Sequence, residues 1–144
     1  MEHSSLRCPK SSKPNGKVYA LTQEEQGLFV KTLESHKVPK NRNDYKKQLL
    51  IELYTGMRMG EINALKPENV DFGRKVIHVR GTVSMGINNR IYRSDHPKTS
   101  AGVRDVPMND LVRPILRDAI DEMVENPEGT IFYDHNQDRV ISTM

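Results

Sequence analysis

TGMRMGEINAL, residues 55–65, decides how this part of the chain folds and where its chemistry lies. Gly56 suits the end of one helix, because glycine readily adopts the left-handed backbone that often closes a helix. A second, short helix is expected over residues 58–65, before a proline stops it. Arg58 therefore lies at a helix start, where the helix dipole disfavours a cation. By itself this placement fits either an ordinary solvated surface arginine or an arginine that is kept for function. Glu61 follows three residues later, close enough to hold the guanidinium.

The composition indicates a single polar domain. The chain has 144 residues, of which 35% are hydrophobic and 28% are charged. A chain of this length can bury about 68% of the surface that its unfolded form exposes. No apolar run approaches the ~18 residues that a membrane helix needs, and the first residues lack the apolar core of a signal peptide. We therefore expect a cytoplasmic protein without a membrane partner. The single cysteine, Cys8, excludes an internal disulfide framework. The net charge of +3 permits a nucleic-acid partner without requiring one.

The N-terminal part of the chain predicts a linker followed by two helices. Residues 1–19 are rich in Ser, Lys, Pro, Asn and Gly, so we expect a flexible tail or linker there. A helix begins after Thr22, since Glu25 can complete a capping box with it. A second helix is expected over residues 43–56, where apolar side chains recur every three or four positions. The folded domain is therefore expected over residues 20–144.

The segment after the short helix changes to the alternating pattern of half-buried strands. We expect strands over residues 75–81, 88–94 and 103–108, with a turn over residues 96–102 that holds Pro, Ser and Gly. A broad apolar stripe then predicts a helix over residues 109–125. The fold class is therefore expected to be α+β, mainly helical, with a small three-stranded antiparallel sheet.

Two motifs, in this order, carry a resemblance to a known family. TGMRMGEINALKPENVDF, residues 55–72, resembles the first signature of the tyrosine recombinases, also called the phage integrase family. PKTSAGVRDVPM, residues 97–108, resembles the family's second marker, a hairpin lysine followed by Arg and Val-Pro. LTQEE, residues 21–25, resembles the opening of the catalytic domain. The resemblance covers roughly residues 20–144. The KTSAG form is most similar to integrases of phages and conjugative transposons of Gram-positive bacteria.

The resemblance implies a DNA strand-transfer chemistry. In this family a tyrosine attacks a DNA phosphodiester, forms a 3′-phosphotyrosyl link and releases a 5′-hydroxyl. A second strand's 5′-hydroxyl then reverses the step. Negative charge spreads over the non-bridging phosphate oxygens, so positioning and electrostatic stabilisation supply most of the catalysis. Arginine suits this task because its planar fork binds two phosphate oxygens and stays charged. The implied partners are double-stranded DNA and, at full length, other integrase protomers. No cofactor, metal or small-molecule substrate is implied.

The resemblance also implies roles for individual residues. Arg58 matches the first catalytic arginine, which clamps the scissile phosphate, and Glu61 can hold that guanidinium or brace the fold. Lys98 matches the hairpin lysine that acts as general acid on the leaving 5′-oxygen. Arg80 and Arg93 lie on or beside expected strands, where a basic face could meet DNA phosphates or simply be solvated. Arg104 could likewise contact the DNA backbone or face solvent.

Other parts of the family's catalytic machinery are not found in this sequence. The family also needs a His-x-x-Arg arrangement and a tyrosine near its C-terminus. His135 and Arg139 have three intervening residues instead of two, so we interpret them as unrelated. Residues 130–134 could form a short strand, and residues 140–144 resemble the approach to a further helix. We therefore expect the N-terminal part of a truncated catalytic domain, inactive alone. None of its tyrosines is expected to be the nucleophile: Tyr19, Tyr45, Tyr54, Tyr92 and Tyr133.

Two other function classes stay open. A non-catalytic DNA-binding accessory module, or a remnant of an integrase, could keep the fold and would bind DNA without needing Lys98. A hydrolytic nuclease would use carboxylates and a metal ion, and it needs clustered acids. The Asp and Glu residues here are scattered through the expected helices, which favours the recombinase.

Overall fold

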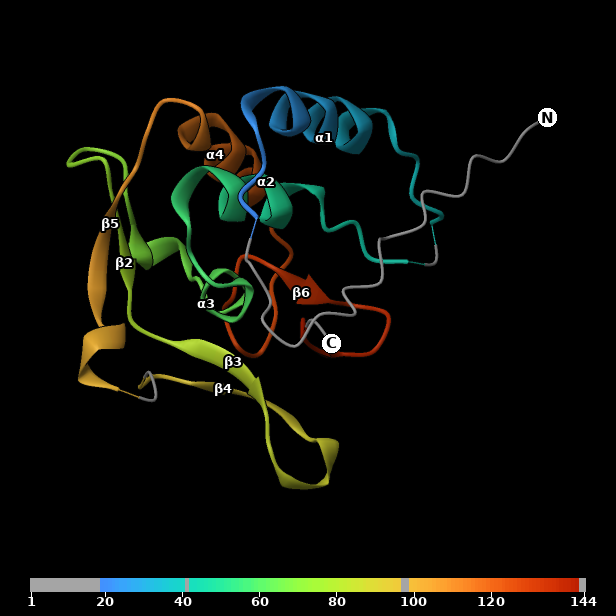
Figure 1. The fold of residues 1–144 in the computed structure, drawn as a ribbon. Coiled ribbons are helices and arrows are strands. Elements are labelled where there is room, and N and C mark those ends of the chain that lie inside the picture. Colours follow the sequence, from blue (N-terminus) through green and yellow to red (C-terminus); the bar gives the residue numbers. More distant parts are fainter. Residues whose placement is uncertain (1–18, 41, 97–98, 143–144) are drawn as a thin grey trace.

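The structure is a computed structural model that describes residues 19–40, 42–96 and 99–142. Nearly all of the expected N-terminal tail lies outside these residues. Figure 1 shows α1, α2 and α4 gathered on one side, the β2–β5 pair beside them, and a hairpin of β3 and β4 that projects away. The predicted α+β class is confirmed. The helices are α1 (Gln23–Ser35), α2 (Lys46–Thr55), α3 (Met59–Asn63) and α4 (Val112–Asp121), and the strands are β1 (Val70–Asp71), β2 (Val76–Val79), β3 (Thr82–Met85), β4 (Ile91–Ser94), β5 (Arg104–Pro107), β6 (Tyr133–Asp134) and β7 (Arg139–Val140).

The first two helices begin and end where the sequence places the signals. The Thr22 hydroxyl accepts a hydrogen bond from the Glu25 N–H at 3.2 Å, and the Glu25 carboxylate accepts one from the Thr22 N–H at 2.8 Å. This is the predicted capping box, which stabilises the start of α1. Gly56 closes α2 with a φ of 68°, in the left-handed region that favours glycine. The chain then turns at once into α3, so Gly56 fixes where Arg58 lies.

The sheet holds β1, β2 and β5 in antiparallel order β1-β2-β5. Ile77 and Val79 of β2 are buried in the core, and Val76 and His78 alternate with them and are half-buried. Ile77 pairs with Val106 of β5, so the buried face continues across both strands. A three-stranded antiparallel sheet is therefore present, as predicted, but its third strand is β1.

The strand expected over residues 88–94 belongs to a different sheet. It forms β4, whose one partner in the described part of the chain is β3, in a separate two-stranded hairpin. Gly81 lies between β2 and β3, where the backbone approaches Ser94 so closely that position 81 has no room for a side chain. A Cβ on Gly81 would stand 2.6 Å from the Ser94 carbonyl oxygen. The sequence of β3 is short and half polar, so it was not predicted to be a strand. Residues 88–94 were therefore wrongly assigned to the sheet of β2 and β5.

The main hydrophobic core packs α2, α3 and α4 against the β1-β2-β5 sheet. α4 is amphipathic and buries Val112, Leu116 and Ala119 against α2 and the sheet. Burying one Leu or Val side chain contributes about 1.5–3 kcal/mol to folding. The Asn109 side chain accepts hydrogen bonds at 3.0 Å from the N–H of Leu111, just before the helix, and from that of Val112, its first residue. The helix is shorter than the predicted residues 109–125.

The C-terminal part of the described chain is a two-stranded hairpin of β6 and β7. β6 lies within the strand predicted over residues 130–134. The sequence pattern predicted only an approach to a helix near Val140, whereas the structure pairs this residue with Tyr133. In the described ranges, no helix has both the length and the apolar character needed to cross a bilayer.

Candidate active site

A cleft of about 420 Å³ opens beside the start of α3. Its walls come from three segments that are distant in sequence: α3, strand β3 and the turn that precedes β5. Gly60 lets α3 lie directly on β3, because a Cβ on it would stand 2.7 Å from the Val83 carbonyl oxygen. The lining residues are Arg58, Gly60, Glu61, Thr82, Val83, Ser84, Thr99 and Gly102.

Arg58 stands at the mouth of this cleft. It is the residue just before α3, with an extended backbone at φ −73° and ψ 145°. Its N–H donates a hydrogen bond to the Glu61 carboxylate at 2.9 Å, which fixes the base of the side chain. Its guanidinium contacts the same carboxylate only at 3.4 Å, and the side chain is 80% exposed. Arg58 is therefore a cation with a fixed backbone and available N–H donors.

Glu61 is the buried centre of the site, with its side chain only 4% exposed. Both terminal nitrogens of Arg104 donate to its two oxygens, each at 2.8 Å. Such fork-to-fork contacts are the strong form of a charged pair. Burial alone raises the pKa of Glu61, but the hydrogen bonds from Arg104 and from the Arg58 N–H outweigh it and hold the pKa below its usual value. The Glu61 hydrogen bonds in turn raise the pKa of Arg104.

The Glu61–Arg104 pair was not found from the sequence. Glu61 was expected to hold Arg58, three residues away, and Arg104 to meet DNA or solvent. The structure instead places Arg104 on the same face of β5 as the buried Val106, at the end nearest α3. The alternating pattern of β5 could have indicated this pair. Residues two apart share a face of a strand, so Arg104 lies on the same face as the buried Val106, and a partly buried cation needs a partner.

Lys98, the predicted general acid, lies outside the described residues. Thr99 and Gly102, which follow it in the chain, both line the cleft.

Arg80, predicted to bind DNA, lies on the outer face of the sheet and does not line the cleft. It donates to the Asp105 carboxylate at 2.8 Å and to the Arg104 carbonyl at 3.1 Å. His78 lies 2.8 Å from the same carboxylate. Hydrogen bonds to His78 and to Arg80 lower the pKa of Asp105. The side chain of Arg80 is 42% exposed, and much of its charge is balanced by its neighbour, so it chiefly ties β2 to β5.

Arg93, also predicted to bind DNA, has a nearly buried side chain. Its side chain is only 6% exposed and pairs with Asp95. Its Nε–H donates to the Ala64 carbonyl at 3.1 Å, and its guanidinium packs close to Gly81. The strand alternation places Arg93 on the inner side of the β3–β4 hairpin, which a single sequence could not reveal because the partner strand was not recognised.

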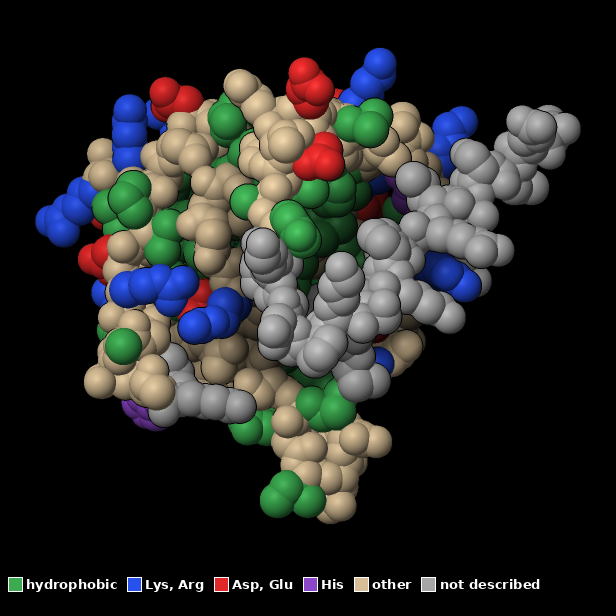
Figure 2. Space-filling view, in the orientation of Figure 1, with side chains coloured by type: hydrophobic (Ala, Val, Ile, Leu, Met, Phe, Trp, Pro, Cys, Tyr) green, Lys and Arg blue, Asp and Glu red, His purple; other side chains and the backbone are tan. Residues whose placement is uncertain are grey.

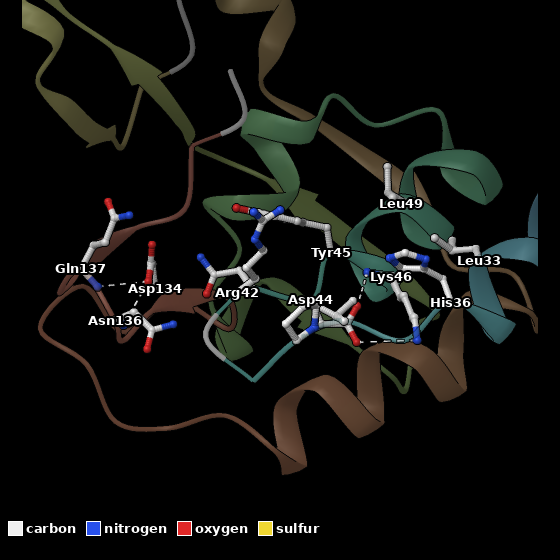
Figure 3. Close-up of a pocket in the computed structure, with 13 residues that line it drawn as sticks. Leu33, His36, Arg42, Asp44, Tyr45, Lys46, Leu49, Asp134, Asn136 and Gln137 are labelled. Atoms are coloured by element: carbon white, nitrogen blue, oxygen red, sulfur yellow. Dashed lines mark hydrogen bonds and ion pairs between the residues drawn. The ribbon is translucent and has the colours of Figure 1, made fainter. Parts of the chain in front are cut away.

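A second hollow of about 470 Å³ lies between the end of α1, the start of α2 and the β6–β7 turn (Figure 3). Its acidic groups already have partners. Asp44 accepts from the Lys46 N–H at 2.9 Å, and Asp134 accepts from the backbone N–H groups of Asn136 and Gln137 at 3.0 and 3.1 Å. None of its lining residues lines the cleft, so it is separate from the site at Arg58.

The surface charge around the site is mixed. Figure 2 shows Lys and Arg side chains at several separate places on this face, with acidic side chains between them, and no continuous basic stripe among the coloured residues. The ring of His135 lies 5.1 Å from that of Tyr133, and neither His135 nor Arg139 lines the cleft. Across the described ranges, no group of three or more His, Cys, Asp or Glu side chains is arranged to hold a metal ion.

Comparison with known proteins identifies the family. The sequence model of the phage integrase family matches residues 19–143. The integrase of Staphylococcus phage L54a is 27% identical over 128 residues, which cover 79% of this chain and 35% of that protein.

The Tn1549 transposon integrase in complex with a circular intermediate DNA matches with a TM-score of 0.73 and 22% identity, covering 91% of this chain and 42% of that chain. The integrase of that transposon in complex with transposon right end DNA matches with a TM-score of 0.70 and 24% identity, covering 87% of this chain and 41% of that chain. This chain spans less than half the length of each of these relatives. With the family match running over nearly all of the described residues, the chain belongs to the phage integrase, or tyrosine recombinase, family.

Proposed function

We propose that this chain carries the phosphate-binding part of the catalytic site of a site-specific DNA recombinase. Such an enzyme cleaves and rejoins double-stranded DNA through a 3′-phosphotyrosyl intermediate. The observation that supports this most is Arg58, whose side chain is 80% exposed at a cleft while its backbone is held by the buried Glu61. An exposed guanidinium with a fixed base suits a phosphate, because its fork keeps its direction and its donors stay available.

In the proposed reaction Arg58 donates to the non-bridging oxygens of the scissile phosphate. Negative charge grows on these oxygens as the attacking tyrosine oxygen bonds to phosphorus, and the guanidinium stabilises it most in the transition state. Glu61 does not touch the phosphate in this scheme. Its carboxylate is already bound by Arg104, so its role is to orient α3 and the backbone of Arg58.

Lys98 is proposed as the general acid. Its ammonium gives a proton to the 5′-oxygen as the bond between that oxygen and phosphorus breaks, and the lysine is left as a neutral amine. The role comes from the family resemblance. The neighbours Thr99 and Gly102 line the same cleft as Arg58, which supports this part of the proposal.

The attacking tyrosine is proposed to lie outside this chain, so that the chain alone is inactive. Tyr45 and Tyr54 are partly buried against the core. The Tyr133 hydroxyl donates to Asp138 at 3.0 Å. Tyr92 is on the β3–β4 hairpin, and among the described residues no tyrosine lines the cleft. The nucleophile would come from sequence that the longer relatives carry, or from another protomer.

Covalent trapping on a nicked DNA duplex tests this function. The 144-residue chain is compared with the same chain extended by whatever coding sequence follows residue 144 in its source DNA. We expect a covalent protein–DNA adduct only from the extended protein. Arg58→Ala should slow its formation by about 10²–10³-fold, because it removes a transition-state donor. Arg74→Ala is the matched control, since Arg74 is 83% exposed and does not line the cleft.

Each outcome is informative. An adduct formed by the chain alone would contradict the proposal that the nucleophile lies elsewhere. If no extended form makes an adduct and DNA binding is unchanged by Arg58→Ala, a non-catalytic DNA-binding accessory module or an integrase remnant becomes the better account.

A further inference from the structure

One buried carboxylate, Glu61, lies in the cleft wall and contacts two arginines, Arg58 and Arg104. Arg104 binds both oxygens of Glu61 at 2.8 Å, whereas the Arg58 guanidinium reaches one oxygen at 3.4 Å. The three charges sum to +1, and the uncompensated charge resides on Arg58, whose side chain is 80% exposed against 35% for Arg104. The Glu61 carboxylate is therefore bound by Arg104, and the guanidinium of Arg58 remains available to another anion.

Arg104 is held in a position from which it can bind Glu61. Its strand is fixed by the register in which Arg104 pairs with Val79, and its carbonyl accepts a hydrogen bond from Arg80 at 3.1 Å. Its side chain therefore starts from a fixed backbone and points to a fixed partner. Arg58 starts from the residue ahead of α3, and its exposed side chain has the freedom to rotate toward Glu61 if the carboxylate loses its other partner.

We propose that Arg104 is a positioning residue, which holds the Glu61 carboxylate so that the Arg58 guanidinium stays available to a DNA phosphate. This inference rests on the proposed function of Arg58. Without Arg104, Arg58 is the one cationic partner that the buried Glu61 charge keeps among the described residues. An unpaired buried carboxylate is costly, so Arg58 turns inward, pairs with Glu61 and is withdrawn from the phosphate.

The proposal differs from a direct contact between Arg104 and DNA. Two of the guanidinium's terminal N–H groups already donate to Glu61, and Nη1 also lies 3.5 Å from the Gly102 carbonyl. A direct contact makes Arg104 and Arg58 two independent phosphate ligands. The positioning role makes the contribution of Arg58 depend on Arg104, and this dependence can be measured.

The first experiment needs no DNA. The arginine side-chain N–H signals of the 144-residue chain are recorded by NMR for the wild type, Arg104→Met and Arg104→Lys. In the wild type we expect the Arg58 guanidinium signals to be averaged by rotation and exchange with water. In Arg104→Met they should become resolved and exchange more slowly, and Arg104→Lys should be intermediate because an ammonium lacks the fork. Unchanged Arg58 signals in both variants would overturn the proposal.

The second experiment is a double-mutant cycle on DNA affinity. Binding to a short labelled duplex at low salt is measured for the wild type, Arg58→Ala, Arg104→Met and the double variant. We expect Arg58→Ala to weaken binding about tenfold in the wild type and less than about twofold in Arg104→Met. Arg74→Met again controls for the loss of one exposed positive charge.

The cycle separates the possible failures. Equal effects of Arg58→Ala in both backgrounds would mean that Arg104 acts independently, either on DNA or only on stability, and would overturn the positioning role. No effect of Arg58→Ala in the wild type, together with the expected NMR change, would contradict the proposed function of Arg58 while upholding its control by Arg104. Thermal unfolding of each variant checks that it is folded at the assay temperature, and Arg104→Lys replaces Arg104→Met if the latter is not.

Discussion

Glu61 and Arg104 lie 43 positions apart in the sequence, yet both oxygens of the Glu61 carboxylate accept hydrogen bonds from Arg104 at 2.8 Å. This pair joins α3, which follows Arg58, to β5, which comes two residues after Gly102. Arg58 and Gly102 both line the cleft, so the elements that follow them are tied together at one buried point.

Removing one partner of this pair should destabilise the fold. Arg104→Met leaves the Glu61 carboxylate buried without its main partner, so we expect the free energy of unfolding to fall by about 2–3 kcal/mol. Urea denaturation measures this. The control is Arg74→Met, which breaks an ion pair with Asp71 in which the exposed Arg74 side chain comes only within 3.9 Å of the carboxylate. Its effect should be below about 1 kcal/mol, and an equal loss in the two variants would contradict the prediction.

Acid should weaken the same pair. The pKa of Glu61 is lower in the folded chain than its ordinary value of 4.5, so the unfolded chain binds the proton more tightly. The contribution of Glu61 to stability is therefore complete at neutral pH. It declines as the pH falls below about 4.5 toward the folded pKa. Unfolding measured from neutral to acidic pH should show the wild type and Glu61→Gln converging at low pH. Asp105, whose pKa is also lowered, is present in both proteins and cancels in the comparison. If the unfolding free energies of the two proteins instead differed by the same amount at every pH, the predicted role of the Glu61 charge would be contradicted.

The contact between α3 and β3 should tolerate only glycine at position 60. In Gly60→Ala the new Cβ would stand 2.7 Å from the Val83 carbonyl oxygen, which belongs to the backbone and cannot rotate away. We expect a loss of about 1–3 kcal/mol in unfolding free energy, because overpacked sites must shift their backbone. Gly27→Ala is the matched control, since nothing lies within 4 Å of a Cβ there and α1 should gain up to about 1 kcal/mol. Equal responses would mean that α3 can move away from β3 at no cost.

Substitution by Met should mainly lower stability at Arg93 and mainly lower DNA affinity at Arg58. Arg93→Met removes a nearly buried side chain that donates to the Ala64 carbonyl, so about 1–3 kcal/mol of stability should be lost. Arg58→Met alters an exposed side chain and should change stability by less than about 0.5 kcal/mol. Fluorescence anisotropy with a DNA duplex should show the reverse order, with the larger loss of affinity in Arg58→Met. A selective loss of affinity in a fully stable Arg93→Met variant would instead support the prediction that Arg93 contacts DNA.

Local signals allowed much of the fold to be predicted. The capping box at Thr22 and the left-handed Gly56 act within a few residues, so their structural effects can be read from adjacent positions. The sheet was predicted less well, because strand pairing depends on residues far apart. β4 has a clear alternating pattern, yet nothing in that pattern shows that its partner is the short, polar β3.

The same limit applies to the site. Arg58 was found because its position at a helix start is unusual, and the motif around it resembles a known family. The partnership of Glu61 with Arg104 required the registers of β2 and β5 and the place of α3, none of which a local pattern contains. Arg80 and Arg93 were predicted as DNA contacts from charge alone, and charge does not reveal that Asp105 and Asp95 lie beside them.

The separation of Glu61 from Arg104 also sets an order of events during translation. The ribosome makes Arg58 and Glu61 together, whereas Arg104 follows only after the four strands β1 to β4 have been synthesised. Until then the carboxylate has Arg58 as its near neighbour, at the i,i+3 spacing that favours a local pair. Such a local pair contributes only about 0.2–0.5 kcal/mol, so in an unfinished chain the two side chains meet briefly and are not fixed. The defined arrangement, with the carboxylate on Arg104 and the Arg58 guanidinium exposed, exists only after β5 has been made and has docked.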